Sequence, residues 1–428
     1  MNGDRRSLLK AVGGSATLAA LAGCVSFSGG ESSGDSGGSG DSGGDSTEAG
    51  DSEGSDATET VTPGTATLWT NRQGDEVESI KSQIEAFESE SPHTVEHENI
   101  TKDLKKKTKT ALAAGNGPTT FGWAHDWTGE FYKNELLSDQ SDDVEVSLDT
   151  FTSTAQDAAQ YKGELIGLPF SSETVGLIVN TDIVDSVPST LSEMQSAMEE
   201  YHDPENGQYG LSYPLNGYFY SAWAHAFGGY YFDEADGSLG LTNEETLQGF
   251  RTVIEDLYPY MPDDPAYGAQ TSPFKNGKAA FAINGPWFTG SLEVPYEVAK
   301  LPSVDGNEPS PYTGISLWYF TARAEGSAGE AARSFAEWYT TNEDLHEQLA
   351  NDFGFIPVLQ SLEGSDALPA EVQGFAANVS AGRPIPTNPK MNAVWGPTET
   401  AFTQALNGKK DLETAMSDAE SKIKENWG

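Results

Sequence analysis

The spacing of hydrophobic residues alternates between two patterns from Thr65 onward. Between 77 and 87, apolar residues recur every three or four positions, which predicts a helix that Pro92 ends. Shorter runs, such as the continuous apolar stretch 175–179, predict strands. Strands are expected at 66–69, 94–100, 121–124, 175–179 and 279–283, and helices at 77–87, 104–114 and 247–257.

This order of strands and helices predicts an α/β fold. Repeated strand-then-helix units are typical of parallel sheets that helices cover. The 364 residues from Thr65 to Gly428 exceed what one hydrophobic core usually holds, so two α/β lobes are expected. Ligands of open α/β sheets bind beyond the carboxyl ends of the strands, and with two lobes this place becomes a cleft between them.

The first 23 residues have the pattern of an export signal. Arg5 and Arg6 precede the weakly apolar run 11–22, as in twin-arginine signals. The run is too short for a stable membrane span. It ends in Leu-Ala-Gly-Cys at 21–24, which resembles a lipobox. We therefore expect cleavage before Cys24 and attachment of lipid to its side chain, with an ordinary cleaved signal as the alternative.

Residues 24–64 are expected to form a disordered tether. From Ser28 to Gly64 the chain consists almost entirely of Gly, Ser, Asp, Glu and Thr, which cannot bury enough apolar surface to offset the entropy of ordering. The sequence Gly-Asp-Ser-Gly-Gly occurs at 34–38 and again at 40–44 and is a serine-protease signature. A catalytic serine needs a rigid scaffold, a histidine and an oxyanion hole, so we reject that interpretation here.

The charge and the cysteine content exclude several classes of protein. The chain has 24 Lys and Arg against 66 Asp and Glu, a net charge of −42, which excludes a nucleic-acid partner. Such acidity suits a protein that stays soluble in very high salt, and we expect a halophilic source; an ordinary acidic secreted protein is the alternative.

A single cysteine excludes disulfides and CxxC sites. His93 and His97 lack a third ligand, so neither a metal nor a cofactor is expected.

Several segments, in the same order, resemble the maltose/maltodextrin-binding proteins, the carbohydrate-specific extracellular solute-binding proteins of ABC importers. The resemblance extends from about Leu68 to the C-terminal helix. It implies a two-lobed periplasmic-binding-protein-like α/β fold for 65–428, with a hinge and an interdomain ligand cleft. Lobe 1 would comprise roughly 65–172 and 312–368, and lobe 2 roughly 173–311 and 369–428. The segments that carry the resemblance are 117–126, 161–169, 283–287 and 391–395.

The resemblance also implies a set of sugar-binding residues. Aromatic rings cover the C–H faces of a pyranose, and carboxylates or amides bind its hydroxyls. Asn71 lies after the first strand, where the family places a polar group; Arg72 and Gln73 stand beside it in a gapped alignment. The chain departs from the family at three positions: Trp127 and Glu399 stand where the family has arginines, and Asn216 stands where a glutamate is frequent. We expect Trp127 to offer an extra stacking surface to a glycan. The matching aromatics are Trp123, Tyr218, Trp287 and Trp395, and the matching carboxylates are Asp126 and Glu173.

The expected function is that of a binding protein rather than an enzyme. We expect a monomer, lipid-anchored through Cys24 to the outer face of the cytoplasmic membrane, that binds maltose or maltodextrin-like oligosaccharides and delivers them to the permease of an ABC importer. Three alternatives stay open: a receptor for another glycan such as trehalose or another glucoside, a chemosensory receptor, and a secreted glycosidase that uses Asp126 and Glu173.

Overall fold

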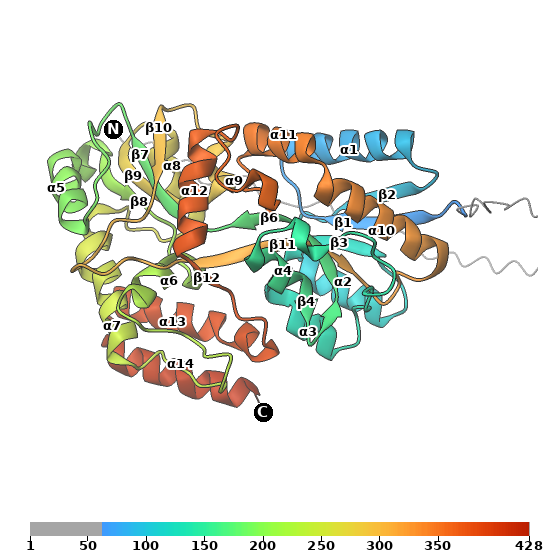
Figure 1. The fold of residues 1–428 in the computed structure, drawn as a ribbon. Coiled ribbons are helices and arrows are strands. Elements are labelled where there is room, and N and C mark those ends of the chain that lie inside the picture. The colour runs from blue at the N-terminus through green and yellow to red at the C-terminus, as the bar shows by residue number, and fades with distance from the viewer. Residues whose placement is uncertain (1–61, 428) are drawn as a thin grey trace, which may run out of the picture. The chain divides into compact units, whose positions relative to one another are not determined.

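The computed structural model describes residues 62–427, drawn in colour in Figure 1. The predicted signal 1–23, Cys24 and almost all of the predicted tether lie outside the described residues. Within 62–427, no helix is both long and apolar enough to cross a membrane.

One half of the architecture is built on a six-stranded sheet. Its order is β12-β11-β3-β1-β2, and β6 also pairs with β11. β1 is parallel to β2 and β3, whereas β11 is antiparallel to β3 and β6 and parallel to β12. These strands are β1 Thr65–Thr70, β2 Thr94–Asn99, β3 Thr120–Ala124, β6 Gly167–Glu173, β11 Tyr312–Phe320 and β12 Arg383–Pro384.

A second sheet of four strands has the order β10-β7-β9-β8. β7 is antiparallel to both of its neighbours, and β8 is parallel to β9. The strands are β7 Gly176–Asn180, β8 Tyr209–Ser212, β9 Ala279–Asn284 and β10 Tyr296–Ala299, and a separate short hairpin joins β4 Gln160–Tyr161 to β5 Glu164–Leu165.

The prediction of parallel sheets is wrong, because both sheets are mixed. The chain passes from β6 directly to β7 through Thr174 and Val175, and so enters the second sheet without a covering helix between the strands. β7 and β11 are buried along their whole length. A strand that is buried on both faces reads as a continuous apolar run, and such a run does not reveal the direction in which the strand pairs.

The helices cover both sheets and include every predicted one. α1 and α10 lie along one side of the six-stranded sheet in Figure 1, and α2 and α3 along the other. The predicted helix 247–257 is α7 followed by a π-helical turn at Thr252–Leu257. The helices are α1 Glu76–Glu90, α2 Leu104–Ala113, α3 Thr128–Lys133, α4 Ser153–Ala159, α5 Leu191–Tyr201, α6 Gly217–Ala226, α7 Glu244–Arg251, α8 Tyr267–Lys275, α9 Pro286–Thr289, α10 Gly326–Thr341, α11 Glu343–Phe353, α12 Ala370–Ala381, α13 Trp395–Leu406 and α14 Leu412–Trp427.

Successive side chains of a strand point to opposite faces of its sheet, so the hydrophobic core is divided into separate clusters on the two faces. In the four-stranded sheet, Leu177 and Val179 join a large cluster that includes residues of α5, α6, α7, α13 and α14. Ile178, between them in sequence, joins a smaller cluster with α8, α9 and α12 on the opposite face. A third cluster surrounds the six-stranded sheet. Each sheet is therefore a firm support for the loops at its strand ends.

Candidate functional site

A cavity of about 710 Å³ lies between elements of the two sheets. Its first wall consists of the loop after β1 and the ends of β3 and β6, which are carboxyl ends, as expected for an α/β ligand site. α9 and two residues of α8 form the opposite wall, and the end of α11 contributes to the rim. The lining residues are 70–76, 122–124, 170–173, Tyr267, Lys275, 286–288, Gly290, Ser291, Ser316, Asp352, Phe353 and Phe355.

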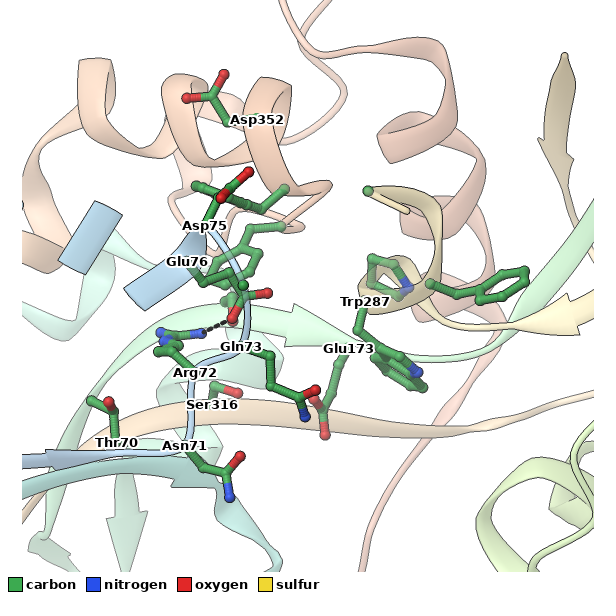
Figure 2. Close-up of a pocket in the computed structure, with 18 of the residues that line it drawn as sticks. Thr70, Asn71, Arg72, Gln73, Asp75, Glu76, Glu173, Trp287, Ser316 and Asp352 are labelled. Atoms are coloured by element: carbon green, nitrogen blue, oxygen red, sulfur yellow. Dashed lines mark ion pairs between the residues drawn. The ribbon is translucent and has the colours of Figure 1, made fainter. Parts of the chain in front are cut away.

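Aromatic side chains face the cavity from both walls. Trp123 lies at the end of β3 and is half-buried, whereas Trp287 of α9 is 40% exposed. Figure 2 shows Trp287 on the wall opposite Gln73, with Glu173 between them. Exposed indole faces on opposing walls can stack on the apolar faces of a flat ring.

Trp127 does not line the cavity. It is 6% exposed and lies in the core of the six-stranded sheet, stacked between Trp123 and Phe131. Its ring centroid is 4.5 Å from that of Trp123, with an interplanar angle of 21°. The expectation that Trp127 offers a stacking surface to a glycan is therefore corrected: the following helix turn directs its ring inward, where it supports Trp123.

Two carboxyl groups and a phenol form a half-buried polar cluster at the cavity: Glu173 lines it, whereas Asp126 and Tyr218 are not among the lining residues. Burial raises the pKa of Asp126 to about 7, an effect that Lys105 opposes and that Glu173 reinforces. Burial also raises the pKa of Glu173 to about 7, against the effect of Arg72. The pKa of Tyr218 is raised by burial and then by these two carboxylates.

Two atoms of this cluster have no hydrogen-bond partner among the described residues. They are Oδ1 of Asp126 and the hydroxyl of Tyr218, and both are buried. Unpaired buried polar atoms are costly, so their presence favours a site that a polar ligand completes. The ring of Tyr218 lies 6.3 Å from that of Trp287, which connects the polar cluster to the aromatic wall.

Arg72 occupies the floor of the cavity between two aromatic rings. Its guanidinium lies 5.2 Å from the Phe170 centroid and 4.9 Å from the Phe355 centroid, and an ion pair of 3.8 Å joins it to Glu76. The backbone of Arg72 is held by Asn99, whose Oδ1 accepts from Arg72 N–H at 2.7 Å and whose Nδ2 donates to Arg72 O at 2.9 Å. Arg72 therefore supplies a fixed positive charge to the site.

The loop after β1 contributes more to the site than the sequence alone indicated. Asn71 lines the cavity as expected, and so do Arg72 and Gln73, which the gapped resemblance ranked lower. Phe170 and Phe355 were missed, because a phenylalanine near a strand has the pattern of a core residue. Their only signal would have been proximity to Arg72, which is not visible along the chain.

Trp395 and Glu399 of α13 are not among the residues that line the cavity. Trp395 packs against Tyr312 and Tyr231, and a Cβ atom at Gly217 would be 3.0 Å from its ring. Glu399 Oε1 accepts a hydrogen bond from Gly217 N–H at 3.2 Å. Both residues therefore support the start of α6, the helix that carries Tyr218.

Residues 62–427 contain no group of three or more His, Cys, Asp or Glu side chains that could hold a metal ion. His97 is hydrogen-bonded to the Thr70 hydroxyl at 2.7 Å, and His93 accepts from Gly64 N–H at 3.1 Å. Both histidines thus have structural partners.

Comparisons with known proteins give the family and the relatives to which the chain is similar. Residues 82–377 match the family model described as "Bacterial extracellular solute-binding protein". The chain is 38% identical to the maltotriose-binding protein of Pyrococcus abyssi over 85% of this chain and 82% of that protein. It is 25% identical to a maltooligosaccharide ABC transporter solute-binding lipoprotein of Streptococcus pneumoniae, over 73% of this chain and 77% of that protein.

A solved structure shares the fold. It is the crystal structure of a cyclo/maltodextrin-binding protein complexed with maltotetraose, with a TM-score of 0.72 and 27% sequence identity. The match covers 85% of this chain and 97% of that chain. Each of these relatives is named for the solute that it binds.

Proposed function

Because the chain belongs to the bacterial extracellular solute-binding protein family, we propose that it is the maltooligosaccharide receptor of an ABC importer. It is a binding protein and not an enzyme, since its family and relatives are named for solutes rather than reactions. The proposed ligand is a short α-glucan, and the proposed partner is the permease of the importer.

One observation carries the proposal: the cavity combines indoles on opposing walls with the carboxyl group of Glu173, and next to it Asp126 has a buried oxygen without a hydrogen-bond partner among the described residues. Trp123 and Trp287 provide the faces on which glucose rings would stack, and Asp126 and Glu173 provide acceptors for hydroxyl groups. A cavity of about 710 Å³ falls within the 300–1,000 Å³ typical of small-molecule sites. The maltotriose-binding relative supports glucose units as the ligand.

Calorimetric titration in high salt tests this function. The panel is glucose, maltose, maltotriose, maltotetraose, trehalose and cellotriose. Maltotriose or maltotetraose should bind with a dissociation constant in the micromolar range, about −8 kcal/mol, and more tightly than glucose. Tightest binding of trehalose would establish the alternative glycan, and absence of heat with every sugar would contradict the proposal. Hydrolysis of a nitrophenyl glucoside would contradict the assignment as a binding protein.

We propose that the two sheets and their helices act as two lobes that close on the ligand. The proposed lobes are 65–172 with 312–368, and 173–311 with 369–428. The direct passage from β6 to β7 supports a hinge at this place, because an extended segment with no helix can absorb small changes of dihedral angle. Small-angle scattering should show a smaller radius of gyration with maltotriose than without it; equal radii would contradict closure.

We also propose that Cys24 anchors the exported protein to the outer face of the cytoplasmic membrane as a monomer. The signal-like sequence before Cys24 supports this, as does the word lipoprotein in the name of the streptococcal relative. A Cys24→Ser protein should appear in the culture medium rather than with membranes. Full retention of this variant on membranes would contradict the anchor. One acyl chain binds membranes only weakly, so a stable anchor implies two chains.

A further inference from the structure

The segment 385–393, here called the strap, contacts the cores of both sheets. It follows β12 and ends in the 3-10 helix Pro389–Ala393, which precedes α13. On one side, Ile385 is buried in the large cluster of the four-stranded sheet, and Lys390 O accepts a hydrogen bond from Nε1–H of Trp427 at 2.9 Å. On the other side, the strap meets α2, α3 and the turn after β3, which belong to the half of the fold with the six-stranded sheet.

The first part of the strap is fixed by buried contacts. Nε2 of His125, in the turn after β3, lies 3.0 Å from Ile385 O, and both groups are buried. A Cβ atom at Gly129 of α3 would overlap Thr387 O and lie 2.7 Å from Cδ of Pro389, so only a glycine permits this close approach. Buried polar contacts are costly to break, because each group would lose its partner without gaining water. We therefore expect this part of the strap to stay in place and to act as a pivot.

The far end of the strap is held by one polar contact that water can reach. Nζ of Lys105, in the first turn of α2, donates to Oδ1 of Asn392 at 2.5 Å. Oε2 of Glu130 holds the same ammonium at 2.8 Å. The side chain of Lys105 is 29% exposed, so water replaces Asn392 at little cost when the two side chains separate. Within residues 62–427, this is the single hydrogen bond between α2 and the strap.

We propose that Lys105 and Asn392 form a latch between the two lobes: they touch when the cleft is closed on a sugar and separate when it opens. The inference rests on the proposed function and extends it, because it assigns part of the affinity to two residues that do not line the cavity. Lys105 lies in the proposed lobe 1 and Asn392 in the proposed lobe 2. A contact that is made only in the closed form stabilises that form, and so tightens binding without touching the ligand.

Titration of Lys105→Met, Asn392→Ala and the double variant tests the latch. Each single variant should bind maltotriose about fivefold more weakly, and the double variant no more weakly than either, because the same contact is lost in all three. The factor should be equal for every sugar that binds and should appear in the dissociation rate rather than the association rate. Multiplied losses in the double variant, losses that differ between sugars, or no loss at all would overturn the latch.

Lys109 provides a matched control one helical turn away. Its ammonium also pairs with Glu130, but among the described residues it has no hydrogen bond to Asn392. Lys109→Met also removes one positive charge from α2, yet it should bind every sugar as wild type does. A loss equal to that of Lys105→Met would show that the charge of α2 matters and the latch does not.

The Gly129→Ala variant tests the pivot. Its methyl group would displace the strap from α3 and thereby move Asn392 away from Lys105. Binding of all sugars should weaken by about fivefold or more, whereas α3 should keep its helix, because alanine favours helix more than glycine does. Circular dichroism establishes that the variant is folded. Wild-type affinity in the folded variant would contradict the role of the strap.

A measurement without sugar separates this proposal from the proposed function. Hydrogen exchange of the backbone amides at 390–393 should be faster in sugar-free Lys105→Met than in wild type, because the 3-10 helix is no longer held against α2. It should be unchanged in Lys109→Met. Unchanged exchange in folded Lys105→Met overturns the latch. Faster exchange in a protein that binds none of the sugars would leave the latch intact and contradict the proposed ligand.

Discussion

Trp287 exposes more of its side chain than a tryptophan normally does. At 40% exposure, its indole leaves apolar surface that a ligand in the cavity would cover. The Trp287→Ala variant should therefore bind maltotriose roughly a hundredfold more weakly, because a large buried aromatic contact is lost. Its unfolding midpoint should change little, since much of the side chain is in solvent.

Two other tryptophans serve as comparisons in the same titration. Trp338 of α10 lies outside the cavity, where its Nε1 donates to Glu90, and Trp338→Phe should bind as wild type does. Trp395→Ala should lose both affinity and stability, because Trp395 supports the start of α6. Wild-type affinity in Trp287→Ala would show that the indole does not touch the sugar.

Glu173 is a residue whose ionisation opposes folding. Burial raises its pKa from 4.5 to about 7, so the unfolded chain releases its proton at lower pH than the folded protein. The free energy of unfolding should therefore fall as the pH rises from 4.5 to 7. In Glu173→Gln this fall should be smaller by about 1–3 kcal/mol. Chemical denaturation at a series of pH values measures the difference, and parallel curves would contradict the linkage.

The residues of the site could be predicted only where the residues next to them in sequence form a recognisable motif. Trp123 and Trp287 belong to short segments that resemble a family, and both line the cavity. The sandwich of Phe170, Arg72 and Phe355 joins segments that are about a hundred positions or more apart, so no local pattern indicates it. The direction in which Trp127 points depends on the turn after β3 and is equally hidden.

At the scale of elements, the start of α6 determines where Tyr218 lies. Oδ1 of Asn216 accepts hydrogen bonds from the N–H groups of Tyr218 and Phe219, at 3.0 and 3.2 Å. Asn216→Ala should lower the free energy of unfolding by about 1 kcal/mol, because the helix loses its N-cap. It should also weaken maltotriose binding through Tyr218.

The Asn216→Ser variant restores a capping oxygen and serves as the control. Urea denaturation and sugar titration of both variants measure the two effects. If Asn216→Ala and Asn216→Ser have equal stability, the cap does not determine the position of this helix.

The positions of the strands were easier to predict from the sequence than the directions in which the strands pair. The predicted strands at 66–69, 94–100, 121–124, 175–179 and 279–283 are confirmed within a residue or two. The antiparallel position of β11 could not be predicted, since the pairing depends on partners far along the chain. Hydrophobic spacing reports which face is buried and contains no information about the neighbouring strand.

At the scale of the whole molecule, the net charge of −42 acts on stability. Like charges repel one another in a compact chain, and salt screens this repulsion. The free energy of unfolding should therefore rise between about 0.15 M and 3 M KCl, by more than the few tenths of a kcal/mol that one exposed ion pair contributes. Urea denaturation at fixed pH and rising salt measures the change. Lower stability at 3 M KCl would contradict the expectation of adaptation to high salt.

β11 belongs to two hydrophobic clusters at once. Tyr312, at its start, packs in the large cluster beside the four-stranded sheet, and the residues from Ile315 to Phe320 lie mainly in the cluster of the six-stranded sheet. Disorder in either cluster would therefore disturb β11, which contributes buried side chains to the other cluster as well. The folded chain should consequently melt as one cooperative unit, with equal calorimetric and van't Hoff enthalpies, and amide exchange in both sheets should be limited by the same global opening.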